Sequence, residues 1–191
     1  MSRVRGSWAA AAVVASALGV TSFTAMATRE APQTASADAI KRGNYLVLTA
    51  GCHDCHTPTK MGPLGPEPDM SLALSGHPEA MKLPPPPPAS GPWIASIAAT
   101  MTAWAGPWGV SYTANLTPDK ETGLGNYTEA QFIQTIRDGK KQGRGRPLLP
   151  PMPWPMYRNF TDDDLKAIFA YLRSIKQIRN KVPEPVFAEP R

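Results

Sequence analysis

Both cysteines of this chain fall within five consecutive residues, in the order Cys52, His53, Asp54, Cys55 and His56. This C-x-x-C-H pattern is the attachment signature of a c-type haem. The two-residue gap lets one turn of backbone present both thiols to the two haem vinyl groups, and each addition leaves a thioether. The histidine that follows then supplies the proximal nitrogen to the iron. We therefore predict that Cys52 and Cys55 carry one covalent haem c and that His56 ligates its iron.

Three other chemistries could use the same residues. A zinc site needs about four ligands, and the chain offers only His53, His56 and His77 beside the two thiolates. A catalytic dithiol of the thioredoxin type sits at a helix start in a βαβ unit, and no βαβ pattern is visible here. A disulfide between Cys52 and Cys55 would be strained and would close almost no loop. Covalent haem therefore remains the favoured interpretation.

The composition limits the class of protein that carries this motif. The chain has 191 residues, of which 42% are hydrophobic and 18% charged. This is enough apolar material for one domain, or at most two small ones, and it argues against global disorder. The formal charge of +5 comes from 20 basic and 15 acidic residues that are scattered along the chain, so we predict no nucleic-acid partner. The 22 prolines are clustered, which predicts helices joined by long extended loops.

The N-terminal residues have the pattern of an export signal. Arg3 and Arg5 precede an uncharged run rich in alanine, and Ala25-Met26-Ala27 has the small-x-small pattern of a signal-peptidase site. We predict that residues 1–27 are a signal peptide and that the protein is exported to the periplasm or an equivalent space. A second candidate cleavage site is Ala35-Ser36-Ala37. The alternative is a retained membrane anchor, because the uncharged run is just long enough to span a bilayer, and only then would the protein associate with a membrane.

Three helices are predicted from capping residues and apolar spacing. Asp38 can cap a first helix that runs to Gly51 and leads directly into the C-x-x-C-H motif. A capping box at Thr128 opens a second helix, and Gly139 is its natural end. A third helix begins at Thr161. Its apolar residues recur at helical spacing: Leu165, Ile168, Phe169, Leu172 and Ile175.

Three helices with the C-x-x-C-H motif at the end of the first resemble the class I cytochrome c family. The resemblance implies an all-α, class I cytochrome c fold, with three core helices around one haem c. It also implies that the first and last helices cross near the haem. Gly43 and Tyr45 would then contact one face of the last helix, made by Phe169, Tyr171 and Leu172.

The domain organisation follows from the extent of this resemblance. The cytochrome c domain would span residues 38–178, after a linker of residues 28–37. Residues 66–93 would be a proline-rich insertion, in which Pro84 to Pro88 form a stiff, solvated spacer. Residues 179–191 would be an extended tail along the surface.

The stretch Pro151-Met152-Pro153-Trp154 resembles the axial-methionine segment of the cytochrome c subunits found with membrane-bound sugar and alcohol dehydrogenases. The resemblance implies that Met152 is the second axial ligand of the iron. The surrounding prolines leave few free φ angles, so the segment is stiff. A thioether is a soft, neutral ligand that raises the reduction potential by favouring ferrous iron. Met156 is the main alternative ligand, and His77 or an open sixth position are the others.

Residues 104–119 are similar to a second segment of the same subunits. The pair Gly106-Pro107 between two aromatic runs predicts a short β-hairpin beside the haem. We expect Asn115 and Thr117 near the haem propionates. Finally, Gly62-Pro63-Leu64 resembles the class I segment whose proline carbonyl accepts the N–H of the proximal histidine, a bond that would fix the orientation of that ring.

These expectations describe an exported carrier of single electrons, which transforms no substrate itself and exchanges electrons with redox partner proteins. Exposed lysines such as Lys60, Lys140 and Lys141 could steer acidic partners. A first alternative is a haem subunit fixed in a larger dehydrogenase or oxidase complex, with the aromatic stretch Trp93–Trp108 as its docking face. A second alternative is a haem sensor or peroxidase whose sixth position opens.

Overall fold

The computed structural model describes residues 35–88 and 91–188. The predicted signal peptide, its alternative as a membrane anchor, and the linker as far as residue 34 lie outside the described residues. Within the described ranges, no helix is both long and apolar enough to cross a bilayer. The first described element is the helix that leads into the C-x-x-C-H motif.

Helix α1 (Ala37–Thr49) is present as predicted, but its cap is a different residue. The Ser36 hydroxyl accepts the Ala39 N–H at 3.1 Å and caps the helix, so the prediction of Asp38 as the cap is wrong. A serine hydroxyl is as good a cap as a carboxylate, which explains the ambiguity. Asp38 lies in the first turn, where its negative charge favours the positive end of the helix dipole.

The other two predicted helices begin at the residues their signals indicate, and the second also ends as predicted, but the third ends at Ser174, so Ile175 lies beyond it in extended backbone. Helix α3 (Glu129–Asp138) starts with a complete capping box, in which the Thr128 and Gln131 side chains each accept the other's backbone N–H. Gly139 ends it in the left-handed conformation, with φ of 64°. Helix α5 (Asp162–Ser174) is capped by Thr161, whose hydroxyl accepts the Asp164 N–H at 3.1 Å.

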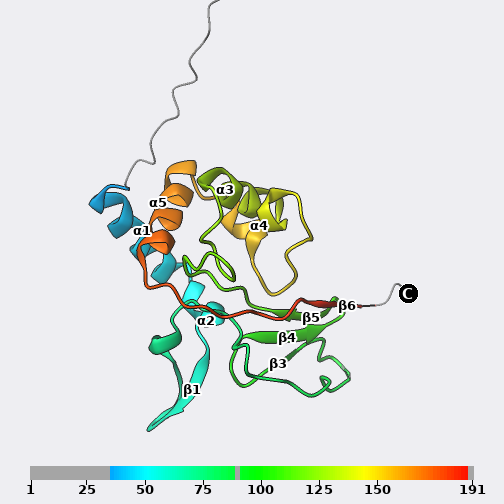
Figure 1. Ribbon diagram of the computed structural model, residues 1–191. Helices are drawn as coiled ribbons and strands as arrows, with labels where there is room; N and C mark the ends of the chain where they lie inside the picture. The colour runs from blue at the N-terminus through cyan, green and yellow to red at the C-terminus, as the bar shows by residue number, and fades with distance from the viewer. Residues whose placement is uncertain (1–34, 89–90, 189–191) are drawn as a thin grey trace, which may run out of the picture. The chain divides into compact units, whose positions relative to one another are not determined.

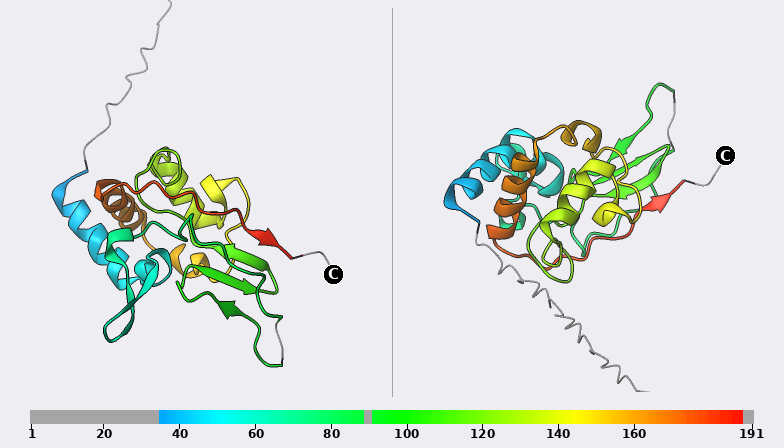
Figure 2. Two further views of the ribbon diagram at one scale, coloured as in Figure 1. Left: turned by 60° about the horizontal axis from the view of Figure 1, so that its bottom comes forward. Right: turned by 90° about the horizontal axis from the view of Figure 1, so that it is seen from above.

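Helices α1 and α5 lie side by side, which confirms the predicted crossing of the first and last helices (Figures 1 and 2). Gly43 lies at the contact, because a Cβ there would collide with the Ala167 carbonyl oxygen and come within 2.8 Å of the Tyr171 Cβ. The absence of a side chain is therefore what lets the two backbones approach. Tyr45, which we predicted in the same contact, is 56% exposed and so lies mostly outside the buried part of this contact.

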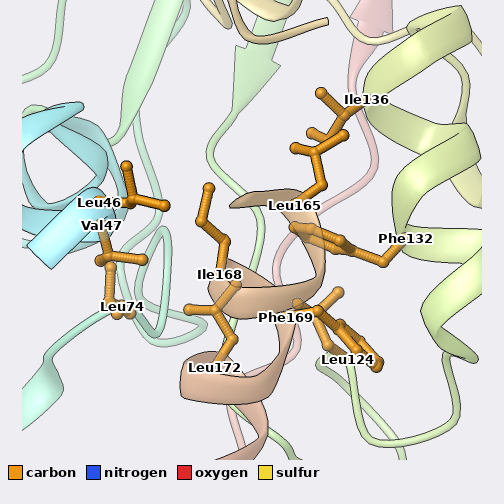
Figure 3. Close-up of a cluster of buried hydrophobic side chains, with 10 residues drawn as sticks. All are labelled: Leu46, Val47, Leu74, Leu124, Phe132, Ile136, Leu165, Ile168, Phe169 and Leu172. Atoms are coloured by element: carbon orange, nitrogen blue, oxygen red, sulfur yellow. The ribbon is translucent and has the colours of Figure 1, made fainter. Parts of the chain in front are cut away.

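The hydrophobic core lies between these three helices (Figure 3). The rings of Phe132 and Phe169 stack with centroids 5.2 Å apart and join α3 to α5. Each such buried side chain contributes roughly 1.5–3 kcal/mol to stability. The core comprises Leu46, Val47, Leu74, Leu124, Phe132, Ile136, Leu165, Ile168, Phe169 and Leu172.

The expectation of an all-α fold has to be corrected, because two antiparallel sheets accompany the helices. The predicted β-hairpin is confirmed as β4 (Ala103–Gly106) and β5 (Gly109–Tyr112). It is the centre of a four-stranded sheet in the order β3-β4-β5-β6, whose outer strands are β3 (Ser96–Ile97) and β6 (Val186–Phe187). The C-terminal tail therefore adds a strand to the sheet. The outer strands are only two residues long, which is too short for an alternating pattern to predict them.

The remaining elements are short. Strands β1 (Thr59–Gly62) and β2 (Gly65–Pro68) form a separate hairpin directly after the C-x-x-C-H motif. The spacer Pro84 to Pro88 is exposed throughout, as predicted. The other helical turns are α2 (Cys52–His56), α4 (Trp154–Tyr157), and the 3-10 turns η1 (Met70–Leu72) and η2 (Lys141–Gly143).

A candidate haem site around His56

The C-x-x-C-H motif forms a helical turn of its own, α2, immediately after α1. Gly51 joins the two helices in the left-handed conformation, with φ of 69°. Cys52 and Cys55 form no disulfide and are half-buried, and Cys52 packs against the hydrophobic core. One turn of helix therefore presents both sulfurs and places His56 directly after them.

The His56 imidazole is held in a single orientation and tautomer. Its ring is buried, with 8% exposed, and its Nδ1 lies 2.7 Å from the Ala114 carbonyl oxygen. A carbonyl can only accept, so Nδ1 carries the hydrogen and Nε2 keeps its lone pair. Burial lowers the pKa of His56, which favours the neutral ring. A neutral imidazole with a free Nε2 is the form that ligates a metal.

The acceptor of this hydrogen bond is not the predicted one. Pro63 and Leu64 lie in the turn between β1 and β2, exposed to solvent, so they cannot accept the His56 N–H. Ala114 accepts it instead, because β5 ends at Tyr112 and the chain then passes beside the buried ring. Ala114 lies within residues 104–119, the stretch that resembles a segment of the dehydrogenase cytochrome c subunits. Every residue has a backbone carbonyl, so the residue type at position 114 does not reveal that its carbonyl is the acceptor.

The thiols do not have the properties of a catalytic dithiol. Burial raises the pKa of Cys52 to about 11 and also raises the pKa of Cys55. The reactive cysteine of a redox dithiol has a lowered pKa, so the shift is in the opposite direction. Within residues 35–88 and 91–188, no three side chains of His, Cys, Asp or Glu converge to form a metal-ion site.

The structure separates the candidates for the second axial position. Met152 is half-buried and packs against the hydrophobic core. Met156 lies on α4 and is 72% exposed. His77 is fully buried, and its two ring nitrogens lie 2.9 Å from the Thr102 hydroxyl and 3.3 Å from the Met81 carbonyl. His77 is committed to these partners, and Met152 stays the predicted second ligand.

The hairpin β4–β5 connects the segment of Met152 to that of His56. The Ser111 hydroxyl donates to the Pro150 carbonyl at 2.6 Å, two residues before Met152. Beyond the end of the same strand, the Ala114 carbonyl accepts the N–H of His56. One strand and its extension thus bond to His56 and to the segment that contains Met152.

Two buried donors on this hairpin lack acceptors. The indole N–H groups of Trp104 and Trp108 have no hydrogen-bond partner among the described residues. Trp104 is directly opposite Ser111, so both side chains lie on the face that packs against the Met152 segment. The Trp108 ring covers Gly106 on that strand pair. A buried N–H without an acceptor is unusual in a protein.

These features fit a haem. The two propionates of a haem are anionic acceptors, which unpaired indole donors would satisfy. Two thiols on one helical turn, a neutral histidine with a free Nε2 and a half-buried methionine supply the other groups that a c-type haem needs. Asn115 and Thr117, which we expected near the propionates, bond to each other and to the C-terminal segment. Sequence reasoning did not single out Ser111 or Ala114, and it placed no unpaired donor at Trp104 or Trp108.

The sequence model of the cytochrome c family matches residues 40–176. The chain belongs to the cytochrome c family. Its class I fold and its role in electron transfer are therefore established, and it is an electron-transfer protein rather than an enzyme. The family binds haem c covalently, which agrees with the fit of the residues around His56.

Several relatives are subunits of dehydrogenases. The chain is 31% identical over 155 residues to the fructose dehydrogenase cytochrome subunit of Gluconobacter japonicus, covering 81% of this chain and 25% of that one. It is 31% identical over 159 residues to the gluconate 2-dehydrogenase cytochrome c subunit of Pantoea cypripedii, covering 83% and 27%. It is 30% identical over 187 residues to the cytochrome c subunit of the quinone alcohol dehydrogenase of Gluconobacter oxydans, covering 96% and 30%. The chain thus spans between a quarter and a third of the length of these relatives.

Proposed function

We propose that this cytochrome c is the haem subunit of a dehydrogenase complex, in which it passes single electrons from a catalytic subunit to the next acceptor. The similarity to cytochrome subunits of three different dehydrogenases carries this proposal. An exposed apolar segment next to β3 supports it, because Trp93 is 77% exposed and Ile94 is 65% exposed. Such a patch is typical of a surface that a partner covers.

Within this proposal, each site residue has a separate role. Cys52 and Cys55 hold one haem c through thioethers, His56 ligates through Nε2, and Met152 ligates through its sulfur. The haem supplies an iron that changes between the ferrous and ferric states. The Ala114 carbonyl keeps the His56 ring oriented, and the buried indole N–H groups of Trp104 and Trp108 would donate to the anionic propionates. With both axial positions filled by side chains, no coordination position is left for a substrate.

We also propose export. A basic start, an uncharged run and a small-x-small site support a signal peptide over residues 1–27 and a periplasmic or equivalent location. A retained anchor is the alternative, and it would place the same haem site at the outer face of a membrane. Comparing the N-terminal residue of the purified protein with Thr28 distinguishes the two.

A free single-haem carrier is the second candidate. Two cysteines make one attachment motif in this chain, and one attachment motif is what a single-haem carrier needs. Size-exclusion chromatography of a native extract separates the two proposals. A haem-containing species that also contains a dehydrogenase subunit, and that is reduced when the dehydrogenase substrate is added, supports the complex. A discrete species of the size of this chain alone, not reduced by that substrate, contradicts it and favours the free carrier.

The sensor or peroxidase alternative makes a different prediction. An open sixth position binds cyanide or carbon monoxide immediately, whereas a methionine ligand must first be displaced. Mixing the purified oxidised holoprotein with cyanide, and the reduced form with carbon monoxide, tests this. Slow binding supports electron transfer through a closed coordination sphere, and immediate binding would contradict it.

A further inference from the structure

Two buried asparagines join three segments that are far apart in the sequence. Asn115 and Asn180 are only 3% and 8% exposed. The Asn180 amide donates to the carbonyls of Ser75 at 2.7 Å and His77 at 2.9 Å, and its oxygen accepts the Glu79 N–H at 2.8 Å. Both N–H donors of the Asn180 amide, and one lone pair of its oxygen, are thus used by the backbone of residues 75–79.

Asn115 connects the C-terminal segment to the residue that holds His56. Its amide donates to the Ile178 carbonyl at 2.8 Å and to the Thr122 hydroxyl at 3.1 Å. Its oxygen accepts the backbone N–H of Thr117 at 2.9 Å. Asn115 follows Ala114 directly in the chain, so these bonds fix the peptide next to the one that accepts the His56 N–H.

Residues 75–77 lie against His56 and Ala114 at the same time. The Gly76 N–H donates to the His56 carbonyl at 2.8 Å, and the His77 N–H donates to the Thr113 carbonyl at 3.0 Å. Gly76 has φ of 77°, and a Cβ there would collide with the Thr113 carbonyl oxygen and lie 2.6 Å from the Ala114 carbonyl carbon. The backbone of Gly76 therefore packs directly against the Ala114 carbonyl. This contact leaves the Ala114 carbonyl no room to move towards Gly76.

We propose that Asn180 and Asn115 are positioning residues for the proximal histidine. Asn180 holds residues 75–77 against Ala114, and Asn115 anchors the Ala114 segment to the C-terminal chain. Together they keep the Ala114 carbonyl in place as acceptor of the His56 N–H. The inference rests on the proposed role of His56 as a haem ligand. It assigns a function to Asn180, which lies beyond residues 40–176 matched by the family, and to Gly76, which lies in the predicted proline-rich insertion of residues 66–93.

The strength of this hydrogen bond affects the properties of the ligand. A firm bond from Nδ1–H to a carbonyl increases the electron donation of the ring through Nε2. Greater donation favours the ferric state. Loosening the Ala114 carbonyl should therefore raise the reduction potential and let water reach the Nδ1–H more often.

The test compares Asn180→Ala with two controls in the haem-loaded full chain. Nuclear magnetic resonance measures the exchange of the His56 Nδ1–H with water, and a reductive titration measures the potential. Asn126→Ala removes an exposed asparagine bonded to the Lys120 carbonyl. Thr128→Ala removes the capping box of α3, whose hydrogen bonds join only Thr128 and Gln131, and so destabilises the fold without touching a bond of Ala114.

For Asn180→Ala we expect exchange faster by about tenfold, the factor that corresponds to one lost hydrogen bond, together with a raised potential. Both controls should keep the wild-type values. If Asn180→Ala loses stability as Thr128→Ala does but keeps the wild-type exchange rate and potential, Asn180 is only structural and the inference is wrong. Should Asn180→Ala not fold, Asn180→Asp is judged by the same criteria, since it keeps the size and the acceptor but loses both donors.

Failure of the proposed function gives a different result. If mass spectrometry shows no haem on the wild-type chain, both proposals are overturned. If the haem is attached and the methionine–iron absorption band is intact, but exchange and potential do not respond to Asn180→Ala, only the positioning inference fails.

Discussion

The helical region and the hairpin region of this cytochrome c are built by different forces. Helices α1, α3 and α5 enclose an apolar core, and their ends are fixed by local caps such as Thr128 and Thr161. The hairpin β4–β5, residues 74–77 and the C-terminal segment are joined by hydrogen bonds between side chains and distant backbone. Asn180, for example, bonds a carbonyl 105 residues away. The apolar helical region supplies stability, whereas the hydrogen-bonded hairpin region determines the surroundings of the candidate haem ligands.

The largest expected effect is a loss of stability in the helical region. Leu165 is buried between the three helices, and Leu165→Ala leaves a cavity in the core. We expect a loss of about 2–5 kcal/mol in the free energy of unfolding, measured by denaturant titration. Leu64→Ala, at the exposed tip of the β1–β2 hairpin, is the matched control and should change little. An equal loss in both variants would contradict the assignment of the core.

The next effect concerns the ligand that the hairpin region holds. Met152→Ala removes the proposed thioether ligand, which favours ferrous iron, so the potential should fall by on the order of 0.1 V. The near-red absorption band of the methionine–iron bond should disappear from the oxidised protein. Met156→Ala is the control, because this side chain is exposed on α4. Retention of the band in Met152→Ala, with its loss in Met156→Ala, would assign the ligand to the other methionine.

A smaller effect tests the connection between the hairpin and the Met152 segment. Ser111→Ala deletes the hydrogen bond to the Pro150 carbonyl and should cost about 1 kcal/mol. If this bond holds Met152 in place, the near-red band should weaken more readily on warming than in wild type. Ser174→Ala removes an exposed hydroxyl bonded within α5 and serves as control. A band with the same temperature dependence in all three proteins would show that Ser111 does not support Met152.

The smallest effect is a pH dependence of stability. His77 is buried beside Tyr112 and near Lys82, and burial lowers its pKa below the ordinary value. The folded protein therefore prefers the neutral ring, and this contribution is present above the ordinary histidine pKa and is lost as the pH falls below it. Stability should fall more steeply with acidification in wild type than in His77→Gln, measured by denaturant titration between about pH 5 and 7.5. Identical slopes would contradict the prediction.

The sequence predicted the helical region well because its signals are local. The spacing of Leu165, Ile168, Phe169 and Leu172 and the capping box at Thr128 each lie within a few turns of the chain. The C-x-x-C-H motif is equally local. The error at Ser36 arose because two residues capable of capping stand two positions apart.

The hairpin region was predicted only in part, because its bonds join distant segments through the backbone. The hairpin β4–β5 has a turn signal at Gly106-Pro107, but strand β6 is two residues long and pairs with a partner more than seventy positions earlier. The acceptor of the His56 N–H is a carbonyl, and every residue has one, so the choice of Ala114 over Pro63 cannot be read from side chains. The roles of Asn180 and Gly76 become visible only when the segments are folded together.

The central claim is that Cys52 and Cys55 carry a haem whose iron His56 ligates. Mass spectrometry of peptides from the purified, haem-matured chain tests it most directly. We predict a peptide containing both cysteines whose mass is increased by that of one haem, and no free thiol on either residue. A peptide of unmodified mass with two free thiols would contradict the account.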